Sequence, residues 1–329
     1  MLKYIPRREL LKVRLNLWQI LSEGRFSSKS LLTLKVIFVA FLYTYLSLCP
    51  GFGQVYNLRA DSGFPFKVNI TGSGPAVYLI PGLACSGDVW NTTVSHLKSH
   101  YTCYVFTLDG FGGVPKTQDR PFLKAEVKAI ERYTLKNHVQ TPIIIGHSLG
   151  GFLAWWLAID APKMWKAIVS VDGLPYVGAL QNPKMTVADN QASAKQIYKM
   201  YASMSKAEFD SGLKLALSEQ VTSLRNLSFI YTKSKYSDPK AVGEAFNEMM
   251  LTDLRASVGA VQCPVLQYMS AQFYKDPKAL NRAKESYLAQ IRPCRRAKLI
   301  VAKNARHFIF LDSPNFFFKS LDNFLEHLH

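Results

Sequence analysis

The feature that most constrains this chain is the segment GHSLGG at 146–151, which follows the apolar run PIII and opens the helical stretch LGGFLAWWLA. A strand that reverses sharply into a helix exposes the residue at the turn, at the carboxyl edge of a sheet. The flanking glycines suit such a turn, because it leaves no room for larger side chains. The segment therefore predicts a strand, a tight turn and a helix, with the Ser148 hydroxyl exposed at the turn.

Short apolar runs alternate with helical stretches from about residue 55 onward. This alternation is typical of a mostly parallel sheet with helices on both faces, an α/β fold. Several runs, such as VYLI, IIIG and AIVSV, are continuously apolar, as expected of strands that are buried on both faces. The expected strands span 66–70, 76–80, 101–108, 142–146, 167–171, 264–269 and 297–301, and the expected core helices span 89–97, 122–137, 149–160, 278–291 and 315–327.

The alternation breaks once, at about 175–258. The helices expected there span 193–204, 206–217, 220–227 and 239–251, and no strand-like run of comparable strength lies among them. Long insertions in compact domains tend to be functional. The sequence therefore predicts a helical cap over the sheet edge, within a single domain at 54–329.

A serine hydroxyl is a poor nucleophile unless a neighbouring base takes its proton. Among the histidines, His307 follows the last expected strand and precedes the last helix, in a loop at the same edge of the sheet as Ser148. His147 adjoins the serine, but neighbouring side chains at such a turn point apart. We interpret His147 as a packing or hydrogen-bonding residue, and His307 as the predicted general base.

The base in turn needs a carboxylate that fixes its tautomer. Asp276, in the loop after the run PVLQYM, is the first choice, because that loop borders the His307 loop directly. Asp172, at the end of the run AIVSV, is the rival. Asp109 opens the turn DGFGG and is interpreted as structural.

Acyl transfer also develops an oxyanion, which two backbone N–H groups can stabilise. The N–H of Leu149, directly after the serine, is one candidate, and the N–H of Leu83 in the turn IPGLA is the other. The sequence contains no cluster with metal-ligand spacing, no phosphate-binding loop and no dinucleotide motif. We therefore predict no cofactor and no metal.

From about residue 55 to its end, the chain resembles the α/β-hydrolase family. The resemblance is to the esterase-like branch, which has a helical cap between the sixth and seventh strands of the family's core. The motifs that carry the resemblance are GHSLGG at 146–151, PGL at 81–83, DGFGG at 109–113, VDG at 171–173, CPVL at 263–266 and RHF at 306–308. The resemblance implies a serine hydrolase with an α/β-hydrolase fold. It also implies a catalytic triad in the chain order Ser148, Asp276 and His307.

Together these features predict an enzyme that hydrolyses a carboxylic ester of a small molecule through an acyl-enzyme intermediate. The alternatives are cleavage of an amide, thioester or carbon–carbon bond by the same residues, and a non-catalytic binding protein on a hydrolase fold. The substrate is expected to be small or medium-sized and apolar, because Trp and Met residues are frequent near the turn and in the cap. These residues are Trp90, Trp155, Trp156, Met185, Met200, Met204, Met249 and Met250.

The first 53 residues differ in composition from the rest. Basic residues precede the apolar run LLTLKVIFVAFLYTYLSL at 31–48, and Cys-Pro-Gly-Phe-Gly follows it. This order is typical of a signal peptide, although the run is also just long enough to be an uncleaved membrane anchor. In either case the domain is expected outside the cytoplasm, and only this segment would contact a membrane.

The formal net charge of +17 raises the question of a nucleic-acid partner. The basic residues are spread along the chain, and their densest group, at 292–298, is interpreted as a solvated loop, so no nucleic-acid partner is predicted. A compartment outside the cytoplasm permits disulfides. Cys263 and Cys294 each lie just before one of two consecutive parallel strands, so we expect a disulfide between them.

Overall fold

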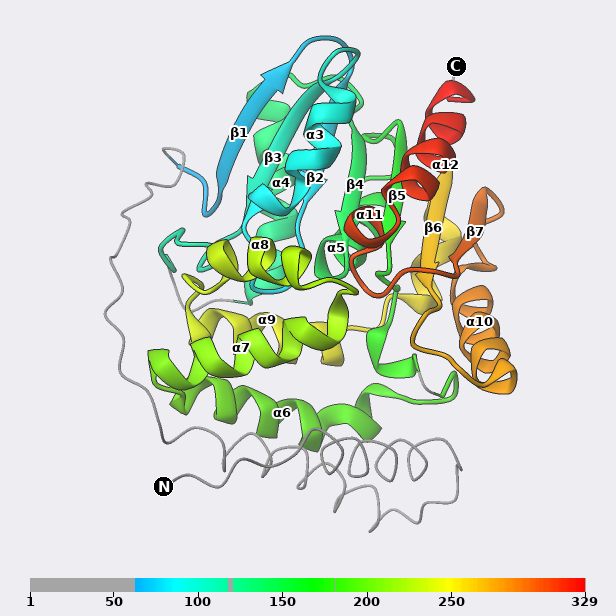
Figure 1. The fold of residues 1–329 in the computed structure, drawn as a ribbon. Helices are drawn as coiled ribbons and strands as arrows, with labels where there is room; N and C mark the ends of the chain where they lie inside the picture. Colours follow the sequence, from blue (N-terminus) through cyan, green and yellow to red (C-terminus); the bar gives the residue numbers. More distant parts are fainter. Residues whose placement is uncertain (1–62, 118–120, 181, 329) are drawn as a thin grey trace, which may run out of the picture. The chain divides into compact units, whose positions relative to one another are not determined.

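The computed structural model describes residues 63–117, 121–180 and 182–328. Its sheet has the strand order β1-β3-β2-β4-β5-β6-β7, in which β1 is antiparallel to β3 and the other neighbours are parallel (Figure 1). The strands are β1 (Lys67–Gly72), β2 (Ala76–Ile80), β3 (Thr102–Thr107), β4 (Ile143–His147), β5 (Ala167–Val171), β6 (Val265–Ser270) and β7 (Ala297–Ala302). The predicted α/β fold class is confirmed.

Helices cover both faces of the sheet. Successive side chains of a strand point to opposite faces, so Val77 of β2 belongs to one core cluster and Tyr78 to another. The cluster around Tyr78 includes residues of α4 (Phe122–Lys136) and α5 (Leu149–Asp160), and the cluster around Val77 includes residues of α3 (Asn91–Leu97), α11 (Ile309–Asp312) and α12 (Pro314–Glu326). The central strands β4 and β5 are buried along their whole length, which explains their continuously apolar sequences.

Among the described residues between β5 and β6, four α-helices lie in the interval predicted for the cap. They are α6 (Val187–Ser203), α7 (Lys206–Gln220), α8 (Leu224–Ser234) and α9 (Pro239–Leu251). Figure 1 shows them gathered along one edge of the sheet. The expected first residues of α6 and α8, 193 and 220, were wrong, because capping residues set the starts of these two helices. Thr186 and Asp189 form a capping box at the start of α6, ahead of the expected start at 193, and the Ser223 side chain accepts the Asn226 N–H at the start of α8.

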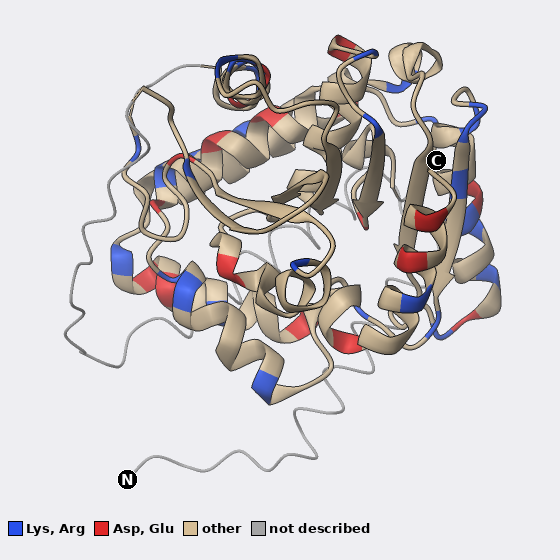
Figure 2. Ribbon diagram, turned by 90° about the horizontal axis from the view of Figure 1, so that it is seen from above, with Lys and Arg blue, Asp and Glu red and all other residues tan. Residues whose placement is uncertain are grey.

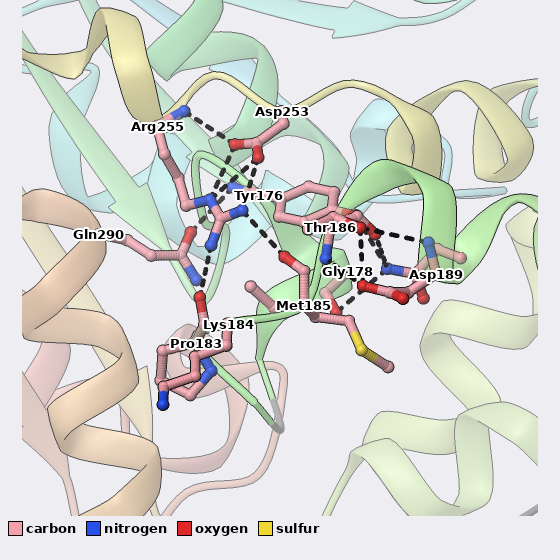
Figure 3. Close-up of polar contacts among 12 residues, drawn as sticks. Tyr176, Gly178, Pro183, Lys184, Met185, Thr186, Asp189, Asp253, Arg255 and Gln290 are labelled. Atoms are coloured by element: carbon pink, nitrogen blue, oxygen red, sulfur yellow. Dashed lines mark hydrogen bonds and ion pairs between the residues drawn. The ribbon is translucent and has the colours of Figure 1, made fainter. Parts of the chain in front are cut away.

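The two ends of the cap are joined by a cluster around Arg255 (Figure 3). The Arg255 guanidinium donates to both carboxylate oxygens of Asp253, and to the carbonyls of Pro183 at 2.6 Å and Met185 at 2.9 Å. It also lies 4.7 Å from the centre of the Tyr176 ring. Since Tyr176 and Met185 precede α6 whereas Arg255 follows α9, the cluster ties the entry of the cap to its exit.

The cap is also bound to the core through α9. The Glu248 carboxylate accepts the backbone N–H groups of Phe122 and Leu123, at the start of α4. A negative charge is favourable at a helix N-terminus, because the first N–H groups of a helix have no partner within it. The Lys116 ammonium lies 3.2 Å from the Glu244 carboxylate of α9, which adds an ion pair between the core and the cap.

The expected leader at 1–53 lies outside the described residues. Within the part of the chain that the structure describes, no helix is both long enough and apolar enough to cross a membrane. Figure 2 shows Lys and Arg residues distributed over several helices and strands, with Asp and Glu residues between them.

Candidate active site

Ser148 lies at the turn between β4 and α5, as the motif predicts. Its φ is +53°, a value that residues other than glycine rarely adopt. The Ser148 N–H donates to the Val171 carbonyl at 2.8 Å, which holds the turn against β5. A Cβ added at Gly146 would lie 2.0 Å from the Gly150 carbonyl oxygen, so the flanking glycines are required. Backbone strain that the surroundings maintain in this way is common at functional sites.

His307 lies in the loop after β7, at the same edge of the sheet. Its Nδ1 hydrogen-bonds to Oδ2 of Asp172 at 2.7 Å. An ionised carboxylate only accepts hydrogen bonds, so Nδ1 carries the proton, and in the neutral ring Nε2 is the acceptor. Ser148, Asp172 and His307 line the same cavity.

Asp172 directly follows β5, with a φ of +56°. Its Oδ2 also accepts from the Ser270 hydroxyl at 2.7 Å, and its Oδ1 accepts from the Ser270 N–H and the Tyr287 hydroxyl, both at 2.8 Å. Burial by itself would raise the pKa of Asp172, but the hydrogen bonds from His307 and Ser270 outweigh burial and hold the pKa below its ordinary value. The carboxylate is therefore ionised at neutral pH, although its side chain is only 6% exposed.

Asp276, the first choice for the acid, does not reach His307. It is the N-cap of α10 (Pro277–Ile291), where its carboxylate accepts two backbone N–H groups of the first turn at 3.0 and 3.2 Å. The expectation that Asp276 orients His307 was therefore wrong, and Asp172 occupies that place. An Asp followed by a Pro at the first helical position is a strong N-cap signal, and it was present in the sequence.

The turn after β2 lies against Ser148. A Cβ added at Gly82 would lie 3.2 Å from the Ser148 Cβ, so glycine allows this close approach. Leu83 is the next residue of the turn. On the other side of Ser148, Leu149 is the first residue of α5, and its N–H has no acceptor within the helix. The two N–H groups predicted as oxyanion donors thus belong to segments that adjoin Ser148.

His147 packs against His307 from the core side. Its Nε2 donates to the His307 carbonyl at 3.0 Å, and the two ring centres are 4.6 Å apart. Burial, and then the neighbouring His307 ring, hold the pKa of His147 well below its ordinary value. His147 is therefore neutral and has the hydrogen-bonding role that its position in the motif suggested.

A cavity of about 250 Å³ opens beside Ser148, Asp172 and His307. No Lys, Arg or Glu side chain is among its described lining residues. Much of the lining is apolar and includes Phe152, Leu174, Val177, Leu180, Met249 and Phe273. Of the Trp and Met residues expected at the pocket, Met249 lines it, whereas Trp90 and Trp155 are fully buried in the core.

Comparison with known proteins identifies the fold family. The family model for the alpha/beta hydrolase fold matches residues 75–314. The chain belongs to the α/β-hydrolase family. Curated relatives of this chain include the pimeloyl-(acyl-carrier protein) methyl ester esterase of Vibrio parahaemolyticus, which is 28% identical over 123 residues, covering 37% of this chain and 46% of that protein. Another is the putative carbamate hydrolase RutD of Escherichia coli, which is 29% identical over 100 residues, covering 30% of this chain and 37% of that protein. Each match thus spans less than half the length of the relative.

Solved structures resemble this chain over most of its length. A thermophilic esterase from Thermogutta terrifontis superposes with a TM-score of 0.66 at 16% identity, covering 80% of this chain and 94% of that chain. The enol-lactonase from Burkholderia xenovorans superposes with a TM-score of 0.64 at 14% identity, covering 80% and 96%. At these identities the likeness shows the fold alone.

Two residues at the candidate site were missed in the sequence analysis. Ser270 ends β6 and Tyr287 lies in α10, and both donate to Asp172. Burial, and then the neighbouring Asp172, raise the pKa of Tyr287 well above its ordinary value, so its hydroxyl keeps the proton that it donates. Neither residue stands in a motif, and the Tyr287 contact depends on how α10 packs on the sheet, so no sequence signal pointed to them.

The expected disulfide is not present. Cys263 and Cys294 are both free and buried, so this prediction was wrong. Burial raises the pKa of the Cys263 thiol to about 11. The two residues do precede neighbouring strands, but a disulfide also requires a specific separation and orientation of the two Cβ atoms, which a shared sheet edge does not ensure.

Proposed function

We propose that this hydrolase cleaves a carboxylic ester by serine catalysis, with Ser148 as the nucleophile, His307 as the general base and Asp172 as the residue that orients His307. The observation that carries the proposal is the 2.7 Å hydrogen bond between His307 Nδ1 and Asp172, beside a cavity that Ser148 also lines. This bond favours the tautomer in which His307 Nε2 accepts a proton.

In the proposed reaction, Ser148 Oγ attacks the carbonyl carbon of the ester while His307 Nε2 takes the serine proton. The former carbonyl oxygen becomes an oxyanion, which the N–H groups of Leu83 and Leu149 stabilise. The ionised Asp172 stabilises the positive charge on His307. His307 then gives its proton to the leaving alcohol, and the acyl group remains on Ser148. In the second half of the reaction, His307 takes a proton from water, and the water oxygen attacks the acyl carbon. The bond between the acyl carbon and Ser148 Oγ then breaks, His307 returns the proton to Oγ, and the acid is released.

The cavity supports a small, uncharged acyl group as the substrate class. Its volume of about 250 Å³ is below the range of about 300–1,000 Å³ that is usual for larger ligands. A free carboxylate on the acyl chain would be buried near Asp172 without a cationic partner, which is unfavourable. The name of the Vibrio parahaemolyticus relative, a methyl ester esterase, supports an ester over an amide.

Fluorophosphonate labelling tests the serine mechanism, because the reagent reacts with activated serines. We expect wild type to be labelled at Ser148 and Ser148→Ala to remain unlabelled. p-Nitrophenyl butyrate and the p-nitrophenyl monoester of succinate then test the substrate class, because their acyl chains are equally long and only the second carries a charge. We expect kcat/KM to be higher for the butyrate. A wild-type protein that is neither labelled nor active would favour a binding protein on a hydrolase fold.

We further propose that the hydrolase works outside the cytoplasm. The proposal is supported by the basic residues and the apolar run within residues 1–53. Cell fractionation with N-terminal sequencing tests it. Recovery of the protein in the cytoplasmic fraction with an intact N-terminus would contradict export.

A further inference from the structure

The loop between α8 and α9 connects the cap to two turns of the core. Ser237 in this loop is fully buried. Its hydroxyl donates to the Ala84 carbonyl at 2.8 Å and accepts the Gly112 N–H at 2.8 Å. One side chain of the cap therefore binds the backbone of the turn at 81–85, which we call the oxyanion turn, and the backbone of the turn at 109–113.

The bond to Ala84 acts on a chain of peptide groups that leads to Leu83. The peptide between Ala84 and Cys85 accepts from Ser237 through its carbonyl. Its N–H donates to the Gly82 carbonyl at 3.1 Å. That carbonyl belongs to the same planar peptide as the Leu83 N–H, and in a trans peptide the two groups point in opposite directions. Holding the first peptide therefore fixes the direction of the N–H that we assign to the oxyanion.

Ala84 needs support from its surroundings in this turn. Its φ is +60°, an uncommon value for a residue with a side chain, and the residue is buried. Such a conformation persists where several contacts maintain it. The hydrogen bond from Ser237 is one of these contacts, and it comes from the cap.

The loop that carries Ser237 is itself held by contacts on both sides. The Asp238 N–H donates to the Gly110 carbonyl at 2.7 Å, and the Asp238 carboxylate accepts the Ala241 N–H at the start of α9. The Lys206 ammonium donates to the Ser237 carbonyl at 2.8 Å. A Cβ added at Gly110 would lie 2.4 Å from the Ala241 Cβ, so the core turn and the cap helix are in direct contact.

We propose that Ser237 is a positioning residue for the oxyanion turn, so that the hydrolase is fully active only while this loop of the cap is docked on the core. The inference rests on the proposed function, in which the Leu83 N–H stabilises the oxyanion. Ser237 is not among the residues that line the cavity. Its loss therefore weakens stabilisation of the transition state and leaves substrate binding in place.

The test compares Ser237→Ala with Ser286→Ala. Ser286 is also fully buried, and its hydroxyl donates to the Ala179 carbonyl at 2.9 Å, so both variants lose a buried hydrogen bond from a serine to the backbone. With p-nitrophenyl butyrate we expect Ser237→Ala to lower kcat by about 10- to 100-fold and to leave KM within about twofold. Ser286→Ala should keep kcat within about twofold of wild type.

Amide hydrogen exchange at the oxyanion turn supplies a readout that does not depend on turnover. We expect faster exchange of the Cys85 N–H in Ser237→Ala than in Ser286→Ala, because the peptide that carries this N–H loses its bond to Ser237. Should Ser237→Ala fail to fold, Ser237→Cys replaces it, because cysteine is similar in size and is a weaker donor. The expected fall in kcat is then smaller.

Equal kcat values for Ser237→Ala and Ser286→Ala would overturn the positioning role. If wild type hydrolyses no ester and is not labelled by the fluorophosphonate, the proposed function fails by itself. Amide exchange then tests the role of Ser237 by itself. Faster exchange of the Cys85 N–H in Ser237→Ala supports control of the turn by the cap, and unchanged exchange refutes it.

Discussion

Replacement of Asp172 by Asn tests the proposed triad most directly. The change keeps the size of the side chain and turns one of its two acceptor oxygens into a donor. At the Oδ1 position, the new NH₂ group would face the Ser270 N–H and the Tyr287 hydroxyl. At the Oδ2 position, it would face the Ser270 hydroxyl and His307 Nδ1.

The structure selects between these two orientations. A backbone N–H cannot become an acceptor, so an amide nitrogen at the Oδ1 position would leave the Ser270 N–H opposed by another donor. At the Oδ2 position the Ser270 hydroxyl can rotate, and His307 can accept at Nδ1 by moving its proton to Nε2. We therefore expect the introduced amide to hold His307 in the tautomer that cannot take the proton of Ser148. The corresponding change in a Ser-His-Asp protease lowers kcat about 10⁴-fold, or about 5.4 kcal/mol in transition-state stabilisation.

The assay is kcat/KM for p-nitrophenyl butyrate at pH 7 to 8, with thermal melting to show that each variant is folded. Asp276→Asn is the matched control, because Asn caps a helix about as well as Asp and should leave the rate within about twofold. The reasoning is refuted if Asp172→Asn retains more than about a tenth of the wild-type rate, or if Asp276→Asn is the more damaging change.

Four further predictions concern residues around the site. Ser148→Ala should abolish ester hydrolysis with little change in melting temperature, and Ser148→Gly should also abolish it but melt higher, because glycine relieves the positive φ. Wild type should be more stable than Asp172→Asn by the largest margin above about pH 4, and this margin should shrink as the pH falls further. The reason is that the pKa of Asp172 is depressed only in the folded state. Urea denaturation at a series of pH values measures the unfolding free energy of both proteins. Tyr287→Phe should lower the unfolding free energy by about 1.5–3 kcal/mol, since it removes one hydrogen bond to the buried carboxylate, again measured in urea. Arg255→Met should speed amide exchange at both ends of the cap, and unchanged exchange there would show that the cluster in Figure 3 does not join them.

The fold, the turn at Ser148 and the position of His307 could be predicted from the order of strands, turns and helices along the sequence. Continuous apolar runs mark strands that are covered on both faces, and the glycines around Ser148 report a turn that excludes side chains. His307 was found because it follows the last strand, and the ends of parallel strands meet at one edge of the sheet.

The acid could not be predicted in the same way, because Asp172 and Asp276 both follow strands that end at this edge. The choice between them depends on the path of the chain after β6, which turns Asp276 toward the start of α10. The N-cap signal before Pro277 would have favoured Asp172, because a carboxylate that caps a helix is already bound. The contacts of Tyr287 and Ser237 could not be predicted from the sequence, because they arise from the packing of α10 and of the cap loop on residues that are distant in the chain.

Ala84, Ser148 and Asp172 all have positive φ values, so the backbone at the site adopts an uncommon conformation at three places. Glycine or asparagine at such positions commonly stabilises a fold. Laboratory selection of this protein for heat resistance alone would therefore accumulate substitutions at Ser148 early and yield stable, inactive proteins. Selection that includes turnover would instead direct stabilising changes to exposed positions that do not contact the site.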